Sequence, residues 1–515
     1  MNISDPRWSV LLGGGIQEGG PVPGKFGVFL SSAGSAVSSA MVMTGAVVSG
    51  PGSEQNVYRR GSAVETVIRQ DGIVNVRSRG LAVSARVESG QLEISGGGCA
   101  ESASMSNGYL TVSNGGTLRS ADITGGKLYG EPGGILSGVR FRNGIASITN
   151  ASVFDMDISG GAVSLTNIQT ASGITVSGGS MVISSGNVIS GLTLRYAPDH
   201  NDSDGNPVYS SGVSARKAAL SGLTVNGGRI IMSNCDLSSA SLQGGHLYFY
   251  GERGYQYSSG IISGGLTVST GSAFLVNAFA DRISALAKEA EGGFFAGTIF
   301  VSGGKTGSAW TGHYGIVDLY SGAVLSSADG YGVISAHPGC SCLNISGNGG
   351  ALHAISSFVS GLRMSGAYIT TYDCSASDIV MDGGYLRGNA SDVVLLNGAA
   401  FEAYTASGVS ALSGTLVRAG FDECRTVVVE SGASAVAYGW DDVNALTSGS
   451  GIMFDPVFSS GAVGSVYSHG IMSSPVIRSG AALYVSDHGS AVDVVLESGG
   501  SIYVDSGSTV TYHQS

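Results

Sequence analysis

Apolar residues recur along this chain in short alternating pairs, and most pairs follow a glycine. Leu92 and Ile94 form one such pair, and Leu110 and Val112 form the next. An alternation with a period of two places both members of a pair on one face of a β-strand. The glycines that precede the pairs recur with a spacing of about 18 residues, at Gly90, Gly108, Gly126, Gly144, Gly161 and Gly179.

A second row of glycines lies between the first, at Gly98, Gly116 and Gly134, and keeps the same spacing. Two turns and two short strands in each period indicate one coil of a solenoid. We expect the glycines at turns, where positive φ is easily reached only by glycine. One coil cannot bury its apolar face alone, so its stability comes from its neighbours. We therefore predict an all-β fold, a parallel β-helix (β-solenoid) with coils of about 18–19 residues.

The regularity of this repeat predicts how the chain is organised. Residues 1–35 do not repeat, and their prolines and glycines indicate an N-terminal cap or docking segment. Elsewhere the repeat is regular, looser or interrupted. We expect regular solenoid at 36–195, an inserted loop at 196–216, solenoid at 217–277, a helical insertion at 278–293, looser decorated solenoid at 294–460, and regular C-terminal coils at 461–515.

One segment has the period of a helix instead of a strand. Ile283, Leu286 and Ala287 form an apolar stripe, Asp281 is placed to cap it, and Gly292-Gly293 follows. This combination of start, stripe and stop predicts one short inserted helix near 279–291.

Composition and charge exclude several classes of protein. The 515 residues include 84 Gly and are 43% apolar, and the apolar residues are strongly patterned, which argues against disorder. The net charge is −12 and no Lys/Arg run occurs, so no nucleic-acid partner is expected. No apolar stretch reaches the length of about 18 residues that a membrane-spanning helix needs, so we predict no transmembrane segment. Residues 1–20 lack the apolar core of a secretory signal.

The cysteines do not indicate a metal centre. Only Cys340 and Cys342 are closely spaced, with His337 nearby, and this C-x-C lacks the second half of a zinc site. Buried thiols in the solenoid core are the better interpretation, and a disulfide between stacked coils stays open. We predict no metal and no cofactor. The six cysteines are Cys99, Cys235, Cys340, Cys342, Cys374 and Cys424.

A weak calcium candidate lies in the polar loop. Asp199, Asp202 and Asp204 resemble a calcium loop, because closely spaced oxygen ligands can wrap a hard cation. The first EF-hand position falls on His200, however, and no Glu follows at the required distance. A plain surface loop is the favoured interpretation.

A weak catalytic candidate is the pair Asp155 and Asp157. At positions i and i+2 of a strand, the two carboxylates would lie about 7 Å apart on one face, within the range of paired glycosidase carboxylates. Solubility alone also requires polar residues on the solvent side of an alternating strand, and the sequence names no third group. We therefore expect that the protein is not an enzyme.

Aromatic residues provide the candidates for contact with carbohydrate or a partner. Exposed rings stack on sugars or dock a partner, whereas an aromatic ladder packed on the solenoid wall is the more ordinary interpretation. Trp440 precedes Asp441 and Asp442, and this segment is a candidate sugar-binding turn, for which one Trp-Asp pair is weak evidence. The candidates are Tyr248, Tyr250, Tyr255, Tyr257, Trp310 and Trp440.

Three runs, at 106–118, 158–165 and 497–509, resemble the repeats of AIDA-type autotransporter adhesins. In this family the passenger is a β-helix on the bacterial surface that mediates adhesion and aggregation, and serines and threonines of its repeats can carry heptose. The similarity covers about half of the chain and is strongest at 72–183 and 461–511. The sequence departs from the family in having neither a signal peptide nor a C-terminal translocator barrel.

The resemblance implies a non-catalytic β-solenoid that acts as a structural rod or adhesin. The expected location is extracellular, on a bacterial cell surface or a virion, and the expected partners are carbohydrate or a cell-surface receptor. Two alternatives stay open: a bacteriophage tail fibre or spike that binds or cleaves polysaccharide, and a self-assembling filament subunit that stacks end to end as a homo-oligomer.

Overall fold

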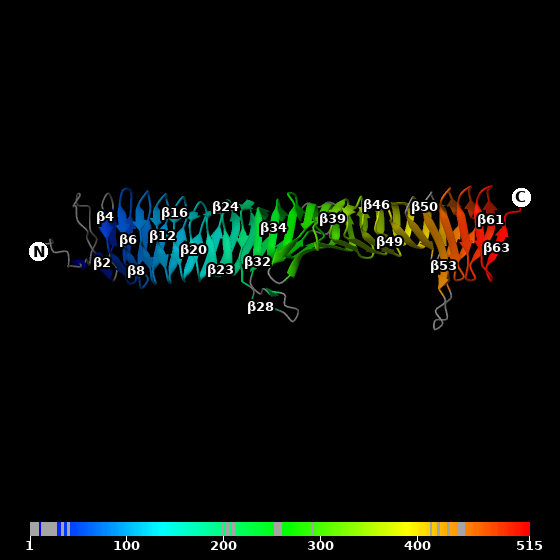
Figure 1. The fold of residues 1–515 in the computed structure, drawn as a ribbon. Helices are drawn as coiled ribbons and strands as arrows, with labels where there is room; N and C mark the ends of the chain where they lie inside the picture. The colour runs from blue at the N-terminus through cyan, green and yellow to red at the C-terminus, as the bar shows by residue number, and fades with distance from the viewer. Residues whose placement is uncertain are drawn as a thin grey trace. The chain divides into compact units, whose positions relative to one another are not determined.

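The computed structural model describes most of the chain as β-structure. The described residues are 10–11, 28–31, 35–38, 42–186, 188–197, 199–201, 207–208, 212–251, 260–290, 293–412, 415–419, 423–429, 433–440 and 449–514. They belong to two compact units, Met1–Gly264 and Gly265–Ser515. Within these ranges there is no α-helix, and hence none that could cross a membrane (Figure 1).

Each regular coil of the first unit consists of three short strands. One coil contains β10 (Leu81–Val83), β11 (Arg86–Val87) and β12 (Gln91–Ile94). The next coil repeats them one period later and pairs with them in parallel, Leu81 with Cys99, Arg86 with Ser104 and Leu92 with Leu110. The strands thus form three parallel sheets, and the predicted parallel β-solenoid is confirmed.

We call the sheet that contains β12 the first sheet, that of β10 the second and that of β11 the third. The sequence pattern indicated only two strands per coil. The third-sheet strands of this region, such as β14 (Ser104–Met105), are too short to produce an alternating pattern.

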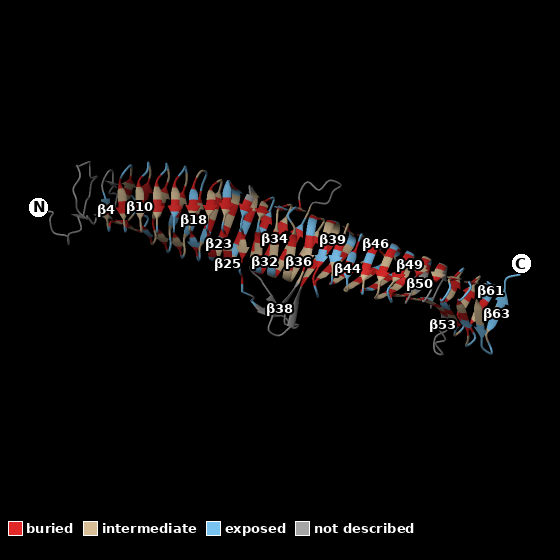
Figure 2. Cartoon of the chain, turned by 45° about the horizontal axis from the view of Figure 1, so that its top comes forward, coloured by how far each residue is buried: buried red, intermediate tan, exposed pale blue. Residues whose placement is uncertain are grey.

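The core consists of ladders in which side chains at the same position of successive coils stack on one another. In β12 and β15 (Tyr109–Val112), burial alternates along the strand, and Leu92, Ile94, Leu110 and Val112 are fully buried (Figure 2). Burying one such side chain stabilises the fold by about 1.5–3 kcal/mol. Because the covering atoms come from the coils above and below, this energy is available only to a stack of coils.

The two glycine rows meet different requirements. Gly108 has a φ of +92°, and a Cβ there would lie 2.3 Å from the carbonyl oxygen of Gly90. Gly116 does not have positive φ, but its Cβ would lie 2.2 Å from the carbonyl oxygen of Ile94 in the preceding coil. The left-handed turn and the close approach of the neighbouring backbone thus both require glycine at position 108, whereas close approach alone requires it at position 116.

The corner between the second and third sheets often lacks glycine altogether. Ser84, Ser102 and Ser120 have φ values of +54°, +54° and +53°. Their backbone N–H groups donate to the next coil, for example Ser102 N to Arg119 O at 2.9 Å. A hydrogen bond between coils thus accompanies a conformation that L-residues rarely adopt.

The predicted helix near 279–291 is wrong. Residues Phe279–Ala285 form β37 and Ala287–Ala290 form β38, which pairs antiparallel with β39 (Gly293–Thr311). Ile283 of β37 pairs in parallel with Ala309 of β39 and is fully buried. A neighbouring coil satisfies the backbone groups here, and this tertiary pairing overrides the helical propensity of the segment.

The length of the coil varies within the regular register. In the first unit Met181 of β25 (Thr175–Gly186) pairs with Val213 of β30 (Gly212–Arg216), so this coil is far longer than the one from Leu92 to Leu110. In the second unit Ser377 of β48 (Ser375–Asp382) pairs with Ser391, and this coil is shorter than the regular one. The strand register continues after both changes.

Only part of the expected N-terminal cap at 1–35 falls within the described residues. These are β1 (Val10–Leu11), β2 (Val28–Ser31) and Ser35. The two strands pair in parallel, and β2 pairs onward with β5 (Val47–Ser49). The described part of this segment therefore continues the ladder of the solenoid.

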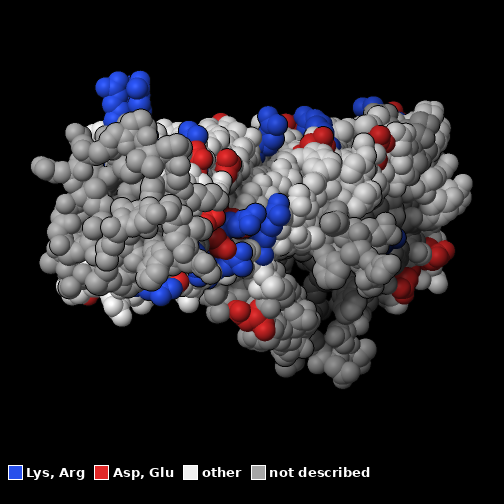
Figure 3. Space-filling view, turned by 90° about the vertical axis from the view of Figure 1, so that its left-hand side faces the viewer, with Lys and Arg blue, Asp and Glu red and all other residues white. Residues whose placement is uncertain are grey.

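Ion pairs connect successive coils of the first unit. Arg142 Nε lies 3.0 Å from Asp122 Oδ1, and Arg119 Nη1 lies 3.7 Å from Glu101 Oε1. All four side chains are about half exposed. Figure 3 shows Lys and Arg side chains together with Asp and Glu side chains on the side of the molecule that faces the viewer.

Candidate binding surfaces of the second unit

The outer face of the first sheet in the second unit carries stacked aromatic rings. Its strands include β40 (Ile316–Leu325), β42 (Val333–Ala336), β45 (Ala351–Ile355), β47 (Tyr368–Tyr372) and β49 (Tyr385–Leu396). In-register parallel strands lie about 4.8 Å apart, a separation that also suits stacked rings. The stacked pairs, which we call the ring columns, have centroid distances of 4.7 Å for Phe274–Phe300, 4.1 Å for Tyr320–His337, 5.5 Å for Tyr368–Tyr385 and 4.8 Å for Tyr484–Tyr503.

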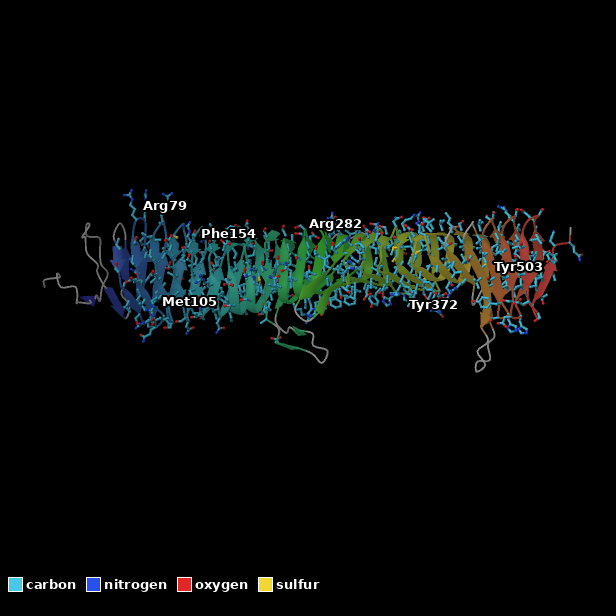
Figure 4. The ribbon with its side chains drawn as sticks, in the orientation of Figure 1. Arg79, Met105, Phe154, Arg282, Tyr372 and Tyr503 are labelled. Carbon is cyan, nitrogen blue, oxygen red and sulfur yellow. The ribbon has the colours of Figure 1, made fainter. Side chains whose placement is uncertain are left out.

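The ring columns are partly open to solvent, since Tyr368, Tyr484 and Tyr503 are exposed and the other five rings are half-buried. In β47 the inward residues Ile369 and Thr371 are buried, whereas Tyr368 is 42% and Tyr372 is 64% exposed. Tyr372 and Tyr503, labelled in Figure 4, are both more than half exposed. Ile355, which is in register with Tyr372, is also exposed. This face therefore presents an apolar and hydroxyl-bearing surface that nothing in the described chain covers.

One carboxylate on this face is fully engaged. The Tyr385 hydroxyl donates a hydrogen bond to Glu402, and Arg387 Nε lies 3.6 Å from Glu402 Oε1. Burial and the hydrogen bond to Glu402 raise the pKa of Tyr385 above its usual value, so the phenol stays a donor. Glu402 is thus paired with two neighbours, unlike the carboxylate that must exchange protons with a substrate in glycoside hydrolysis.

Four rings gather where the third sheet of the second unit turns into the first. Trp310 is 42% exposed, Tyr314 58% and Tyr331 43%. His313 stacks on Tyr331 with centroids 4.9 Å apart and planes inclined by 19°. We call Trp310, His313, Tyr314 and Tyr331 the aromatic corner.

A groove of about 390 Å³ lies on the same third sheet. Arg363 is held in place, because Nη1 donates to Leu362 O at 2.9 Å and Nη2 donates to Asp378 Oδ1 at 2.9 Å. Asp382 accepts a hydrogen bond from Asn397 Nδ2 at 2.5 Å. We call this the polar groove, and its polar lining consists of Asp329, Ser346, Asn348, Arg363, Ser365 and Asp382.

A second hollow, of about 560 Å³, lies on the second sheet. Its floor consists of small residues from the shortest coils, including Ser377, Ser391 and Ser407, and its edge includes Phe358 and Cys374. Because a shorter coil encloses less cross-section, the hollow follows from the short step between Ser377 and Ser391.

The predicted aromatic candidates fall in different places. Tyr248 and Tyr250 end β34 (Ala240–Tyr250) of the first unit, where the Arg229 guanidinium lies 4.7 Å from the Tyr248 ring. On the preceding coil they are in register with Ile231 and Ser233, and Tyr250 is 38% exposed. Trp310 belongs to the aromatic corner. Tyr255 and Tyr257 lie outside the described residues, as does the side chain of Trp440.

The two predicted catalytic aspartates do not share one strand. Asp155 has a φ of +51° at the corner between β22 (Ser152–Phe154) and β23 (Asp157–Ile168). The corner breaks the alternation that the sequence suggested, so Val153 is buried and Phe154, labelled in Figure 4, is only half-buried. The strand spacing used for the carboxylate pair therefore does not apply at this corner, and the catalytic role of these two exposed residues stays a prediction.

The calcium and cysteine candidates are also dispersed. Asp199 is exposed, and Asp202 and Asp204 lie outside the described residues. His337 stacks on Tyr320 at the outer face, whereas Cys340 and Cys342 are buried. Among the residues that the structure describes, no group of three or more His, Cys, Asp or Glu side chains is placed to hold a metal ion.

The cysteines whose side chains the structure describes are free thiols, and the side chain of Cys424 lies outside them. Burial raises the pKa of Cys342 to about 12, and the neighbouring Cys340 and Cys374 add to this effect. The free cysteines are Cys99, Cys235, Cys340, Cys342 and Cys374.

Comparisons with known proteins give little beyond these observations. No protein-family model and no curated protein matches the chain. Among solved structures, the chain is similar to a crystal structure of a TibC-catalysed, hyper-glycosylated TibA fragment. The identity is 15%, the match covers 91% of this chain and 99% of that chain, and the TM-score is 0.21. At this TM-score the likeness carries no argument, so the fold assignment rests on the strand register.

Proposed function

We propose that this chain is a non-catalytic structural β-solenoid that acts as an adhesin on a bacterial cell surface or a virion. Its binding surface is the set of ring columns on the second unit, and its ligands are carbohydrate or a cell-surface receptor. The observation that carries the proposal is the repeated stacking of rings at outward positions, of which Tyr368, Tyr484 and Tyr503 are exposed.

The chemistry of tyrosine suits this role. A tyrosine ring supplies a large rigid contact area at a low cost in conformational entropy, and its hydroxyl adds a hydrogen bond. Rings fixed on successive coils act as linked binding modules, because a second contact of the same ligand becomes intramolecular. Weak single contacts thereby add up along an extended ligand such as a polysaccharide.

The paired state of Glu402 and the corner at Asp155 favour binding over cleavage. Glycoside hydrolysis requires two carboxyl groups at a defined separation on one site. The resemblance of the repeats to AIDA-type passengers supports the same function.

The test is binding of the purified chain to bacterial and host cells and to immobilised polysaccharides. The double variant Tyr368→Ala/Tyr372→Ala removes two exposed rings, and we expect its apparent affinity to fall by roughly tenfold or more. Tyr109→Ala is the matched control, since Tyr109 is 41% exposed on the first unit and stacks on Tyr129. Unchanged binding by the double variant contradicts the proposal.

Two readouts separate the alternatives. Adhesion leaves the length of a bound polymer unchanged, whereas shortening of the polymer supports the tail-spike alternative. A mass in solution that grows with protein concentration without limit supports the end-to-end filament.

A further inference from the structure

We propose that the aromatic corner and the polar groove together form one binding site for a neutral oligosaccharide on the third sheet of the second unit. This inference rests on the proposed binding function, for which it names a second surface and a ligand class.

The two features adjoin through the strand register. Trp310 of β39 pairs with Asp329 of β41 (Ala328–Gly330), so the ring and the first carboxylate of the groove are on neighbouring strands. A bridge between Ala328 and Ile345 continues the ladder to Ser346 of β44 (Ser346–Asn348). Arg363 of β46 (Phe358–Ser365) follows in register with Ser346. One row of outward positions thus leads from the ring into the groove.

The Trp310 ring has a defined seat. A Cβ placed on Gly312 would lie 3.4 Å from Trp310 Cζ3 and 3.5 Å from Cη2, so the ring packs over the bare backbone of that glycine. On the next coil Tyr331 is held by its stack on His313. Exposed rings with fixed positions offer flat apolar platforms, which match the C–H faces of sugar rings.

The groove supplies the polar half of the recognition. Asp329 and Asp382 are acceptors, Arg363 is a donor, and Asn348 provides both through its amide. The hydrogen bonds of Arg363 to Leu362 and Asp378 fix its geometry before any ligand arrives, which lowers the entropic cost of binding. A volume of about 390 Å³ is in the range of small-ligand sites.

The charge of the groove selects the ligand class. The guanidinium of Arg363 is compensated by Asp378, whose Oδ1 lies 2.9 Å away. The carboxylates of Asp329 and Asp382 remain as acceptors, so the groove disfavours a ligand that carries carboxylates of its own. Sugar hydroxyls fit these acceptors without repulsion, and we therefore assign a neutral oligosaccharide over a uronic acid.

The experiment titrates the full chain with neutral hexasaccharides of glucose or mannose and with an oligogalacturonate as the acidic counterpart. Calorimetry and tryptophan fluorescence report binding. We expect a neutral probe to bind, and its affinity to fall about tenfold or more in Trp310→Ala and in Asp329→Asn. Trp310→Phe keeps a ring, so it retains most of the affinity but loses the fluorescence change. Tyr503→Ala, which removes a 53% exposed ring elsewhere on the unit, is the control.

Three results overturn the inference: no binding of any neutral probe, tighter binding of the oligogalacturonate, or equal affinity of Trp310→Ala and the unmodified chain. Circular dichroism and urea unfolding check that each variant is folded. The Tyr368→Ala/Tyr372→Ala variant separates this inference from the proposed function, since it is expected to lose cell binding and keep the oligosaccharide affinity. Failure of the titration with retained cell binding overturns the inference alone.

Discussion

The two units share one kind of coil and differ in what covers its outer face. In the first unit, half-exposed ion pairs such as Arg142–Asp122 on the third sheet join successive coils. In the second unit stacked rings such as Tyr368 and Tyr385 on the first sheet do so, beside ion pairs such as Arg387–Glu402. The contrast is one of degree, because Tyr109 stacks on Tyr129 in the first unit. In both, buried apolar ladders and backbone register hold the coil. The fold therefore does not determine the residues at the outer positions, and we propose that those of the ring columns in the second unit bind ligands.

The largest expected effect tests whether the two cores are equivalent. Phe141 of the first unit and Phe401 of the second are both fully buried. Because each truncation leaves a cavity, we expect Phe141→Ala and Phe401→Ala each to lower the free energy of unfolding by about 3–5 kcal/mol. Hydrogen exchange in the neighbouring strands measures the local loss. A several-fold difference between the two losses breaks the comparison, since it shows that one core is loosely packed.

The second prediction concerns alkaline pH and the second unit. Burial raises the pKa of Cys342 from its usual value near 9.0 to about 12. Between these two pKa values the folded state keeps the thiol proton of Cys342, whereas the unfolded state loses it. The stability that this difference provides is fully present below the pKa of the unfolded state and is lost as the pH rises toward the pKa of the folded state. By pH 11 this loss amounts to roughly 3 kcal/mol.

Urea unfolding at pH 8 and at pH 11 measures this effect. The free energy of unfolding should fall between pH 8 and pH 11 by roughly 3 kcal/mol less in Cys342→Ala than in the unmodified chain. Cys374→Ala, which removes only the smallest cause of the Cys342 shift, should change the pH dependence far less. Equal pH dependence of all three proteins contradicts the prediction.

A third prediction concerns the energy of the ring columns. A double-mutant cycle with Tyr368→Ala and Tyr385→Ala should give a coupling of about 0.5–1.5 kcal/mol, because the rings are stacked and partly desolvated. The coupling should persist in concentrated salt. If high salt abolishes the coupling, the interaction between the two tyrosines is electrostatic. The rings of the second unit would then not differ in kind from the ion pairs of the first.

The smallest effect is expected for the ion pairs of the first unit. The side chains of Arg142 and Asp122 are 53% and 44% exposed. Exposed pairs of this kind contribute about 0.2–1 kcal/mol and are screened by salt. A cycle with Arg142→Ala and Asp122→Ala should therefore show a weak coupling that disappears in concentrated salt. A coupling above that of the tyrosine pair would reverse the order that we infer for the two faces.

The period of the sequence predicted the architecture because each core position recurs once per coil. Leu92 and Leu110 occupy the same place in successive coils, so alternation and spacing together specify both strand and partner. The same method failed at 279–291, since the helical stripe of Ile283 and Leu286 is a local pattern and the pairing of Ile283 with Ala309 is not. At Asp155 a left-handed residue interrupts the strand that the spacing of Asp155 and Asp157 required.

The candidate surface was only partly visible in the sequence. Trp310 was identified by residue type, but its proximity to Asp329 requires the register of the looser coils, where no regular spacing fixes the count. The ring columns combine Phe, Tyr and His from coils of unequal length, so no fixed period shows that Tyr320 meets His337. Tyr372 follows the buried Thr371 in its strand. Its outward orientation could be recognised only once the bounds of that strand were known.

The unequal coils have a consequence for engineering. Met181 pairs with Val213 across a long coil, and Ser377 pairs with Ser391 across a short one, yet the parallel ladder continues on both sides. Each coil closes through hydrogen bonds to its neighbours, so the number of residues between two ladder positions is not fixed. A foreign peptide spliced between Leu194 and Gly212 should leave the flanking ladders intact, which makes this chain a scaffold for displaying epitopes at a chosen place on a repeating wall.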